Sequence, residues 1–313
     1  MVNLGGATEN DRKKIVITKD SKAFFHNNVD YCVGTGRMGL ALTEEYQEEL
    51  RLVQKEIGFK HIRGHGLFCD DMAIFQTYEE DGKVRVEYNY TYLDRVMDAY
   101  KKVGLRPFLE LGFMPKKLAS GSQTIFYWQG NTTPPKDYDM WCNMVHSLLR
   151  HLMGRYGEEE VIQWPIEVWN EPNLCGFWEY ADMQEYFKLF HRTFDAIKEV
   201  NPGFRVGGPA VCGGTDEKWI QAFMEYCHEN HIPVDFVTRH HYTIDPPECI
   251  GHYAYSELMK AEDGFANLKT TRDIIDSFPE YKGLQIHITE FNSSYTPQGV
   301  IHDTNLNAAL IAQ

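Results

Sequence analysis

Short apolar segments alternate with amphipathic stretches along almost the whole chain, and this alternation restricts the fold more than any other feature. Segments rich in β-branched and aromatic residues predict strands at 31–35, 61–68, 106–113, 165–169, 205–211, 236–242 and 284–290. Amphipathic stretches predict helices at 43–57, 90–103, 138–156, 183–200, 217–231, 265–278 and 304–313. A regular strand–helix alternation is typical of βα units that build a parallel sheet.

The number of expected strands and the position of polar residues favour a barrel. A (β/α)₈ barrel of the TIM type closes with eight strands, so an α/β fold of this type that stops before strand 8 is expected over 31–313. An open seven-stranded sheet is the alternative. Polar residues gather near the carboxyl ends of the expected strands, where a barrel carries its active site. These residues are His65, Glu110, Asn170, Glu171, His240, Tyr242 and Glu290.

A glycine-rich segment after the first expected strand raises the alternative of a dinucleotide site. Residues 34–39 read G-T-G-R-M-G and fit the GxGxxG pattern loosely. No acidic residue ends a strand about 20 residues later, as a dinucleotide site requires. A tight turn at the barrel mouth is therefore favoured, and no cofactor is expected. Thr43 is expected to cap the helix at 43–57, and Gly58 and Gly104 to end their helices.

Charge and cysteine content limit the partners and the compartment. The net charge of −14 and the pI near 5.4 disfavour nucleic acid and anionic membranes as partners. No apolar run has the 18 residues of a membrane span, and residues 1–14 lack the apolar core of a secretory signal. The seven cysteines contain no CxxC pair, so reduced thiols and a cytoplasmic location are expected.

Two glutamates suggest the chemistry. Glu171 and Glu290 each stand where an apolar strand gives way to a polar turn. A buried carboxylate costs several kcal/mol unless it is paired, so such positions need a reason. A helix cap or an ion pair would be a purely structural reason. Cleavage of a glycosidic bond is the functional one, because it uses one carboxyl group as acid and another as nucleophile.

The histidines do not predict a metal site. His61 and His65 are four apart, but on a strand four residues span roughly 13 Å, too far for one ion. His240 and His241 are adjacent on a strand and face opposite sides, so at most one enters a pocket. No metal is expected.

From residue 31 onward the chain resembles the glycoside hydrolase family 39 β-xylosidases. The segments that carry the resemblance are 31–37 (YCVGTGR), 62–67 (IRGHGL), 112–121 (GFMPKKLASG), 169–174 (WNEPNL), 206–210 (VGGPA) and 288–295 (ITEFNSSY). Asn-Glu-Pro after one strand and a glutamate after a later one are shared by a clan of retaining barrel glycosidases. The loop at 115–121 and 126–128 is more specific to this family.

The resemblance implies a role for each candidate residue. Glu171, after strand 4, corresponds to the general acid/base, and Glu290, after strand 7, to the nucleophile. Asn170 would contact the sugar 2-hydroxyl. The other residues that the resemblance places at the sugar site are His65, His240, Tyr242, Phe113, Glu110 and Trp128. Family members continue through an eighth strand and a β-sandwich, to which residues 1–30 would contribute a strand; the weakly alternating segment 14–18 is the candidate.

The function expected from this resemblance is a retaining exo-β-1,4-xylosidase. It would release xylose from xylooligosaccharides and other β-xylosides through a covalent xylosyl-enzyme intermediate. Two alternatives stay open: another glycosidase on the same scaffold, such as an α-L-iduronidase-like or endo-acting enzyme, and a catalytically silent carbohydrate-binding fragment. An iduronidase needs cations for its uronate, and only Arg63 and Arg239 stand near strand ends. An unclosed barrel edge is prone to pair with another chain, so a homo-oligomer is one candidate state.

Overall fold

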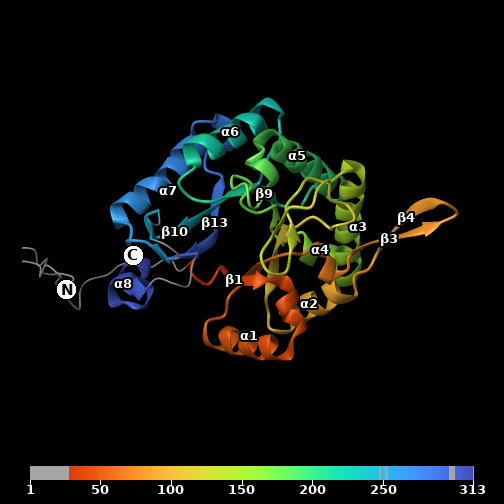
Figure 1. Cartoon of the computed structure of the whole chain (residues 1–313), viewed down its shortest axis with the longest axis horizontal. Helices are drawn as coiled ribbons and strands as arrows, with labels where there is room; N and C mark the ends of the chain where they lie inside the picture. Colours follow the sequence, from red (N-terminus) through yellow and green to blue (C-terminus); the bar gives the residue numbers. More distant parts are fainter. Residues whose placement is uncertain (1–27, 247, 251–252, 296–299, 313) are drawn as a thin grey trace, which may run out of the picture.

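A seven-stranded parallel sheet forms the centre of the molecule. The computed structural model describes residues 28–246, 248–250, 253–295 and 300–312. The strands follow one another in the sheet in their order along the chain (Figure 1). They are β1 (Cys32–Arg37), β2 (His61–His65), β5 (Arg106–Leu111), β8 (Ile166–Val168), β9 (Val206–Val211), β10 (Phe236–Tyr242) and β13 (Gln285–Asn292). All seven strands expected from the sequence are confirmed, with boundaries that differ by a few residues.

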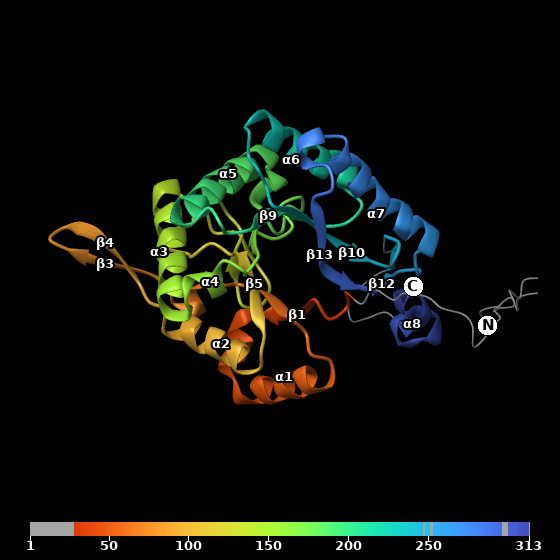
Figure 2. The ribbon, with the colours of Figure 1, turned by 180° about the vertical axis from the view of Figure 1, so that it is seen from behind.

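Helices cross between consecutive strands and surround the sheet, as both views of the ribbon show (Figures 1 and 2). They are α1 (Glu44–Glu56), α2 (Thr91–Lys102), α3 (Tyr138–Tyr156), α4 (Glu158–Val161), α5 (Met183–Val200), α6 (Asp216–Glu229), α7 (Ala261–Asp276) and α8 (Asn305–Ala312). The helices expected at 138–156 and 183–200 are confirmed residue for residue. Parallel strands joined by crossover helices are the βα units that the alternation predicted.

The sheet is curved nearly into a barrel. Its first and last strands, β1 and β13, share no ladder within the described part of the chain. Aromatic rings nevertheless bridge them near their amino-terminal ends, where Tyr31 stacks on His287 with ring centres 5.4 Å apart. The ring of His287 also meets Phe108 and Phe236 edge-on. The amino-terminal end of the barrel is therefore filled by packed rings, whereas the polar groups described in the next subsection lie at the carboxyl-terminal end.

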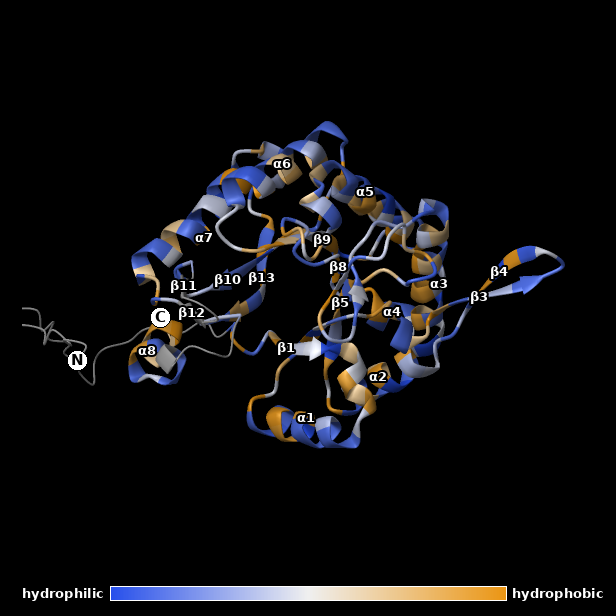
Figure 3. Ribbon diagram, in the orientation of Figure 1, coloured by the Kyte–Doolittle hydropathy of each residue, from blue (hydrophilic) through white to orange (hydrophobic). Residues whose placement is uncertain are grey.

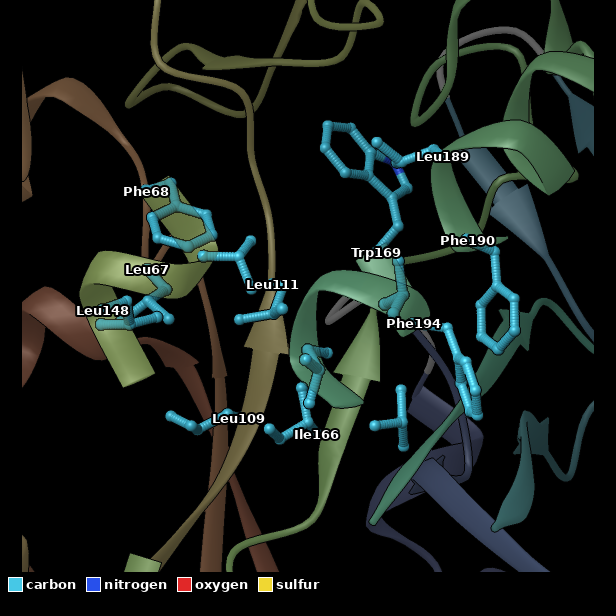
Figure 4. Packing of buried hydrophobic residues seen from close by; sticks show 14 of the residues in the cluster. Leu67, Phe68, Leu109, Leu111, Leu148, Ile166, Trp169, Leu189, Phe190 and Phe194 are labelled. Atoms are coloured by element: carbon cyan, nitrogen blue, oxygen red, sulfur yellow. The ribbon is translucent and has the colours of Figure 1, made fainter. Parts of the chain in front are cut away.

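The main core lies between the sheet and its helices. Helix α3 buries Trp141, Met144, Val145, Leu148, Leu149 and Leu152, a spacing of three and four residues that places them on one face. Side chains of β5, β8 and α5 meet this layer, and Figure 4 shows Leu109, Ile166 and Phe190 among them. The helices carry both hydrophobic and hydrophilic residues, as expected for elements with one face in the core (Figure 3).

Three short hairpins were missed by the sequence analysis. They pair β3 (Phe75–Glu80) with β4 (Lys83–Tyr88), β6 (Thr124–Ile125) with β7 (Gly130–Asn131), and β11 (Glu248–Ile250) with β12 (Tyr253–Tyr255). The β3–β4 hairpin extends away from the barrel (Figures 1 and 2). The sequence contained a signal for this hairpin, because Asp-Gly is a preferred pair for a two-residue hairpin turn. Asp81 and Gly82 both take the positive φ that such a turn requires.

One local prediction was wrong and another was confirmed only in part. The segment 34–39 is not a tight turn: Gly34 and Gly36 lie inside β1, and a 3₁₀ helix from Met38 to Leu42 follows the strand. Thr43 does occupy the N-cap position of α1, but its hydroxyl donates to the carbonyl of Leu40 and caps nothing. Gly58 and Gly104 follow their helices with φ of +77° and +79°, which confirms the predicted helix ends.

Residues 1–27, with the predicted accessory strand at 14–18, lie outside the described residues, so the proposed division at residue 30 stays a prediction. Among the described helices, none has both the length and the apolar character that a membrane span needs.

We expect Asp182→Ala to lower the free energy of unfolding by about 1 kcal/mol. A carboxylate oxygen of Asp182 accepts hydrogen bonds from the backbone N–H groups of Gln184 and Glu185, both at 3.0 Å, at the start of α5. Denaturant unfolding followed by circular dichroism measures the change. Asp182→Asn keeps an acceptor and Thr43→Ala removes no cap, so both should lose less; an equal loss in Thr43→Ala would contradict the capping argument.

Candidate active site

Polar side chains from four strands, β2, β5, β10 and β13, and from the segment after β8 meet at the carboxyl ends of the strands. The structure joins seven of the nine predicted site residues in one network of contacts, which contains Glu171, Glu290, His65, Glu110, Asn170, His240 and Tyr242. Parallel strands bring these groups together because their carboxyl ends share one rim of the barrel. The remaining two, Phe113 and Trp128, belong to an adjoining aromatic cluster.

Glu290 is surrounded by donors and positive charge. The phenol of Tyr242 donates to one carboxylate oxygen at 2.5 Å, and Arg63 donates to the other at 3.1 Å. His240 Nδ1 lies 3.6 Å from the first oxygen and His65 Nε2 lies 3.4 Å from the second. Burial opposes the charge on Glu290, but His240, Arg63, His65 and the Tyr242 hydrogen bond together lower its pKa to about 2. Glu290 is therefore a carboxylate at neutral pH.

Glu171 has different neighbours. One of its oxygens lies 2.8 Å from His240 Nδ1, and its backbone N–H donates to the carbonyl of Ala210. Burial, followed by the negative charge of Glu171, raises the pKa of the Cys212 thiol to about 12. The group beside Glu171 is thus a neutral thiol, whereas Arg63 is paired with Glu290, Glu110 and Glu167.

The backbone around Glu171 takes an uncommon conformation. Trp169 and Glu171 have φ of 72° and 45°, in the left-handed region that non-glycine residues rarely adopt. Such positions cost on the order of 1–3 kcal/mol each and persist only where the surroundings fix them. Trp169 supplies part of this support, since it is fully buried and its indole N–H donates to the carbonyl of Phe177. Trp169 thus packs in the hydrophobic core.

Arg63 connects the site, and the sequence analysis did not assign it a role. Its guanidinium donates to Glu167 at 2.7 Å, to Glu290 at 3.1 Å and to Asn170 Oδ1 at 2.9 Å, and it pairs with Glu110 at 2.9 Å. Burial disfavours its charge, but the carboxylates of Glu167, Glu110 and Glu290 raise its pKa. The sequence offered one signal for this pairing: Arg63 and Glu167 are charged residues inside strands whose pattern otherwise indicates burial.

The contact with Arg63 determines which way the Asn170 amide points. Because Oδ1 accepts from Arg63, the amide nitrogen is on the other side. That nitrogen is buried and has no hydrogen-bond partner among the described residues. The same is true of His240 Nε2. Both are polar groups at the site that a ligand could satisfy.

His65 is held by Glu110. Its Nδ1 lies 2.7 Å from a carboxylate oxygen of Glu110, which is fully buried. Burial disfavours the charged imidazole, yet Glu110 raises the pKa of His65. Glu110 thus supports His65 and Arg63 from within the barrel wall.

The resemblance places Phe113 and Trp128 at the sugar site, and the structure places both rings in one aromatic cluster that adjoins the carboxyl groups. Phe113 is fully buried at the centre of a ring cluster and contacts Trp128, Trp169 and Phe177. Trp128 is half-buried, stacks on Phe126 at 5.0 Å and lies under the guanidinium of Arg37. Phe126 is the ring that reaches the surface: it is 42% exposed and stacks on His65 at 5.8 Å. A sugar-facing role for Phe113 and Trp128 stays untested, and Phe126 is the better placed residue.

Three further charged or basic residues on the strands do not take part in this network. Arg239 is fully buried on the outside of the sheet, where it bonds Asn267 and Thr271 and pairs with Asp216. His241 also faces outward and lies against Gly264 of α7, as expected from its adjacency to His240. His61 faces Tyr31, with its Nδ1 3.1 Å from that backbone carbonyl.

Among the described residues, one group of three offers donor atoms close enough for a single cation. Oxygens of Glu171 and Glu290 and a ring nitrogen of His240 all lie within 4.8 Å of one another. These donors already contact each other, and Arg63 adds a positive charge beside Glu290. The arrangement suits two carboxyl groups acting on the two atoms of one substrate bond better than it suits a metal ion.

The comparisons with known proteins identify the family. The family model described as "Glycosyl hydrolases family 39" matches residues 13–313. The chain belongs to glycosyl hydrolases family 39. A beta-xylosidase of Geobacillus stearothermophilus is 50% identical over 304 residues, which cover 96% of this chain and 60% of that protein. A beta-xylosidase of Caldicellulosiruptor saccharolyticus is 37% identical over 283 residues, covering 90% of this chain and 56% of that protein.

A solved structure of the same family agrees with the fold. A crystal structure described as a monomeric beta-xylosidase from Caulobacter crescentus CB15 matches with a TM-score of 0.83 and 37% sequence identity. The match covers 90% of this chain and 56% of that one. This family 39 chain therefore spans somewhat more than half the length of the relatives it matches.

We expect the purified protein to contain no stoichiometric metal, and a chelator to leave its thermal unfolding temperature unchanged. The physical reason is that the guanidinium of Arg63 competes with a cation for the charge of Glu290. Elemental analysis by mass spectrometry, with and without added zinc, is the measurement. Stoichiometric zinc that disappears in His240→Ala would contradict this expectation.

Proposed function

We propose that this family 39 chain carries the active site of a retaining exo-β-1,4-xylosidase. The observation that carries the proposal is the spacing of Glu171 and Glu290, whose oxygens come within 4.8 Å of each other. Retaining glycosidases hold their two carboxyl groups about 5–5.5 Å apart, whereas inverting ones need roughly 6.5–9.5 Å to admit a water molecule. The short spacing supports direct attack by a carboxylate on the sugar carbon.

The neighbours of the two carboxyl groups suit different roles. Glu290 is held ionised by surrounding donors and cations, so it acts as the nucleophile that forms the xylosyl ester. Glu171 protonates the leaving oxygen and then, as a base, removes a proton from the water that hydrolyses the ester. Once Glu290 has become an ester its negative charge is lost, which favours the deprotonated form of Glu171 in the second step.

The unpartnered polar groups fit a sugar substrate. The Asn170 amide nitrogen, oriented by Arg63, can donate to the 2-hydroxyl of the sugar bound between the carboxyl groups. A hydrogen bond that strengthens as charge develops on the ring stabilises the transition state more than the ground state. The exposed face of Phe126, stacked on His65, offers an apolar wall for the sugar ring.

The preference for a xyloside over a uronide rests on the placement of cations. A uronic acid would need a free cationic side chain near the sugar. Arg239 faces outward onto Asp216, and Arg63 is occupied by three carboxylates and Asn170. An iduronidase-like activity is therefore disfavoured. The two relatives from Geobacillus stearothermophilus and Caldicellulosiruptor saccharolyticus carry the name beta-xylosidase, which supports the same choice.

Location and assembly follow as further proposals. The six cysteines whose side chains the structure describes are free thiols, which supports a cytoplasmic protein. The strands β1 and β13 at the two ends of the sheet leave a route to self-association, so a homo-oligomer remains a candidate.

The chain acting on an aryl β-D-xyloside should release β-xylose as the first product, and Glu290→Ala should release none. Retention follows from two displacements at the same carbon. A proton NMR time course resolves the two anomers before they interconvert. First-formed α-xylose would contradict the retaining mechanism, and an inactive parent would contradict the proposed activity for this chain.

Tyr242→Phe should move the acidic limb of the kcat/KM profile to higher pH. The phenol stabilises the ionised form of Glu290, so its removal raises the pKa of Glu290 and the carboxylate is lost earlier as the pH falls. Tyr281→Phe is the matched control, because its hydroxyl also donates one buried hydrogen bond but to Ile232, away from the site. Equal shifts in both variants would contradict the assignment.

A further inference from the structure

One buried carboxylate at the site has no part in the chemistry described so far. Glu167 lies in the middle of β8 and is 0% exposed. One of its oxygens accepts from Arg63 Nε at 2.7 Å, and the other accepts from the Thr289 hydroxyl at 2.9 Å. Since both oxygens are occupied and the side chain is fully enclosed, Glu167 does not touch substrate.

The bond to Arg63 fixes the direction of two further bonds. A guanidinium is planar and presents its donors in a rigid fork. With Nε held by Glu167, one terminal nitrogen points at Glu290 at 3.1 Å and the other at Asn170 Oδ1 at 2.9 Å. Glu110 lies 2.9 Å from that second nitrogen and is the remaining carboxylate on the fork. A rotation of the fork would therefore displace both groups together.

A second hydrogen bond, from Thr289, links Glu167 to the backbone of β13 next to Glu290. Thr289 directly precedes Glu290 in β13, and its hydroxyl is tied to Glu167 across the barrel. Asn170 and Glu171 follow Glu167 by three and four residues on the segment that leaves β8. Glu167 is thus linked to Glu290 in two ways: through Arg63, which donates to both carboxylates, and through Thr289, which directly precedes Glu290 in the chain.

We propose that Glu167 is a positioning residue that sets the geometry of Glu290 and Asn170 through Arg63 and Thr289. The proposal rests on the glycosidase function proposed above. A displacement of about 1 Å at a reacting group can cost on the order of a hundredfold in rate. The loss should fall on kcat, because these two groups act on the transition state and contribute less to ground-state binding.

Two substitutions at Glu167 distinguish a positioning role from the general destabilisation that loss of the buried ion pair would cause. Glu167→Leu removes both bonds with a similar volume, and should lower kcat by about a hundredfold with KM little changed. Glu167→Gln keeps an oxygen for Arg63 Nε and an amide that can donate to Thr289, so it should recover most of that loss. Glu160→Gln is the matched control, since Glu160 is also paired with an arginine, Arg106, but at the amino-terminal start of β5.

A spectroscopic measurement makes the test independent of turnover. In the parent, the Arg63 Nε–H donates to a carboxylate at 2.7 Å, so its NMR signal should lie downfield and exchange slowly with water. Arg63→Lys identifies the signal by its absence. In Glu167→Leu the signal should move upfield, and the side-chain amide signals of Asn170 should shift with it. Both should stay near their parent positions in Glu167→Gln and Glu160→Gln.

The outcomes are distinct. Unchanged Arg63 and Asn170 signals in a folded Glu167→Leu would overturn the proposal, as would a rate loss explained by the unfolded fraction alone. If Glu167→Leu does not fold, Thr289→Val removes one of the two bonds, and unchanged signals and kcat in that variant would overturn it equally. An inactive parent with the expected signal shifts would refute the proposed function and leave the positioning role supported.

Discussion

A single buried cation holds the rim of this barrel together. The guanidinium of Arg63 is 3% exposed, and an unpaired charge in such a place would cost several kcal/mol. It is stable there because β5, β8 and β13 each bring a carboxylate to it, in Glu110, Glu167 and Glu290. The three strands can do so only in one register, so the charge balance and the strand arrangement depend on each other.

The same balance divides the work between the two carboxyl groups that face each other. Glu290 lies on the side of the cations and stays ionised, while Glu171 is turned toward His240 and a neutral thiol. Two carboxyl groups in different electrostatic surroundings are what acid and nucleophile roles require. The nitrogens of Asn170 and His240, which are buried without a hydrogen-bond partner among the described residues, lie at the same rim and are available to a ligand.

Aromatic residues show where reasoning from sequence reached its limit. The resemblance pointed to Trp128 of the loop at 126–128 as the sugar-site ring, whereas Phe126 is the exposed ring that stacks on His65. Neither propensity nor spacing distinguishes these two rings, because the choice depends on what packs behind them. Trp128 is covered by Arg37 and by the backbone at Gly66, both distant in the sequence, as well as by the nearby Gly130.

The sequence by itself determined the seven strands, their helices and the two glutamates at strand ends, because periodicity and strand boundaries are written into neighbouring residues. It also contained the Asp81–Gly82 signal for the protruding hairpin, although that signal was not used. Only the tertiary structure decided that Arg63 meets Glu167 and Glu290, which lie 104 and 227 positions away along the chain. Such partners are selected by the register and curvature of the whole sheet, which no local pattern of residues specifies.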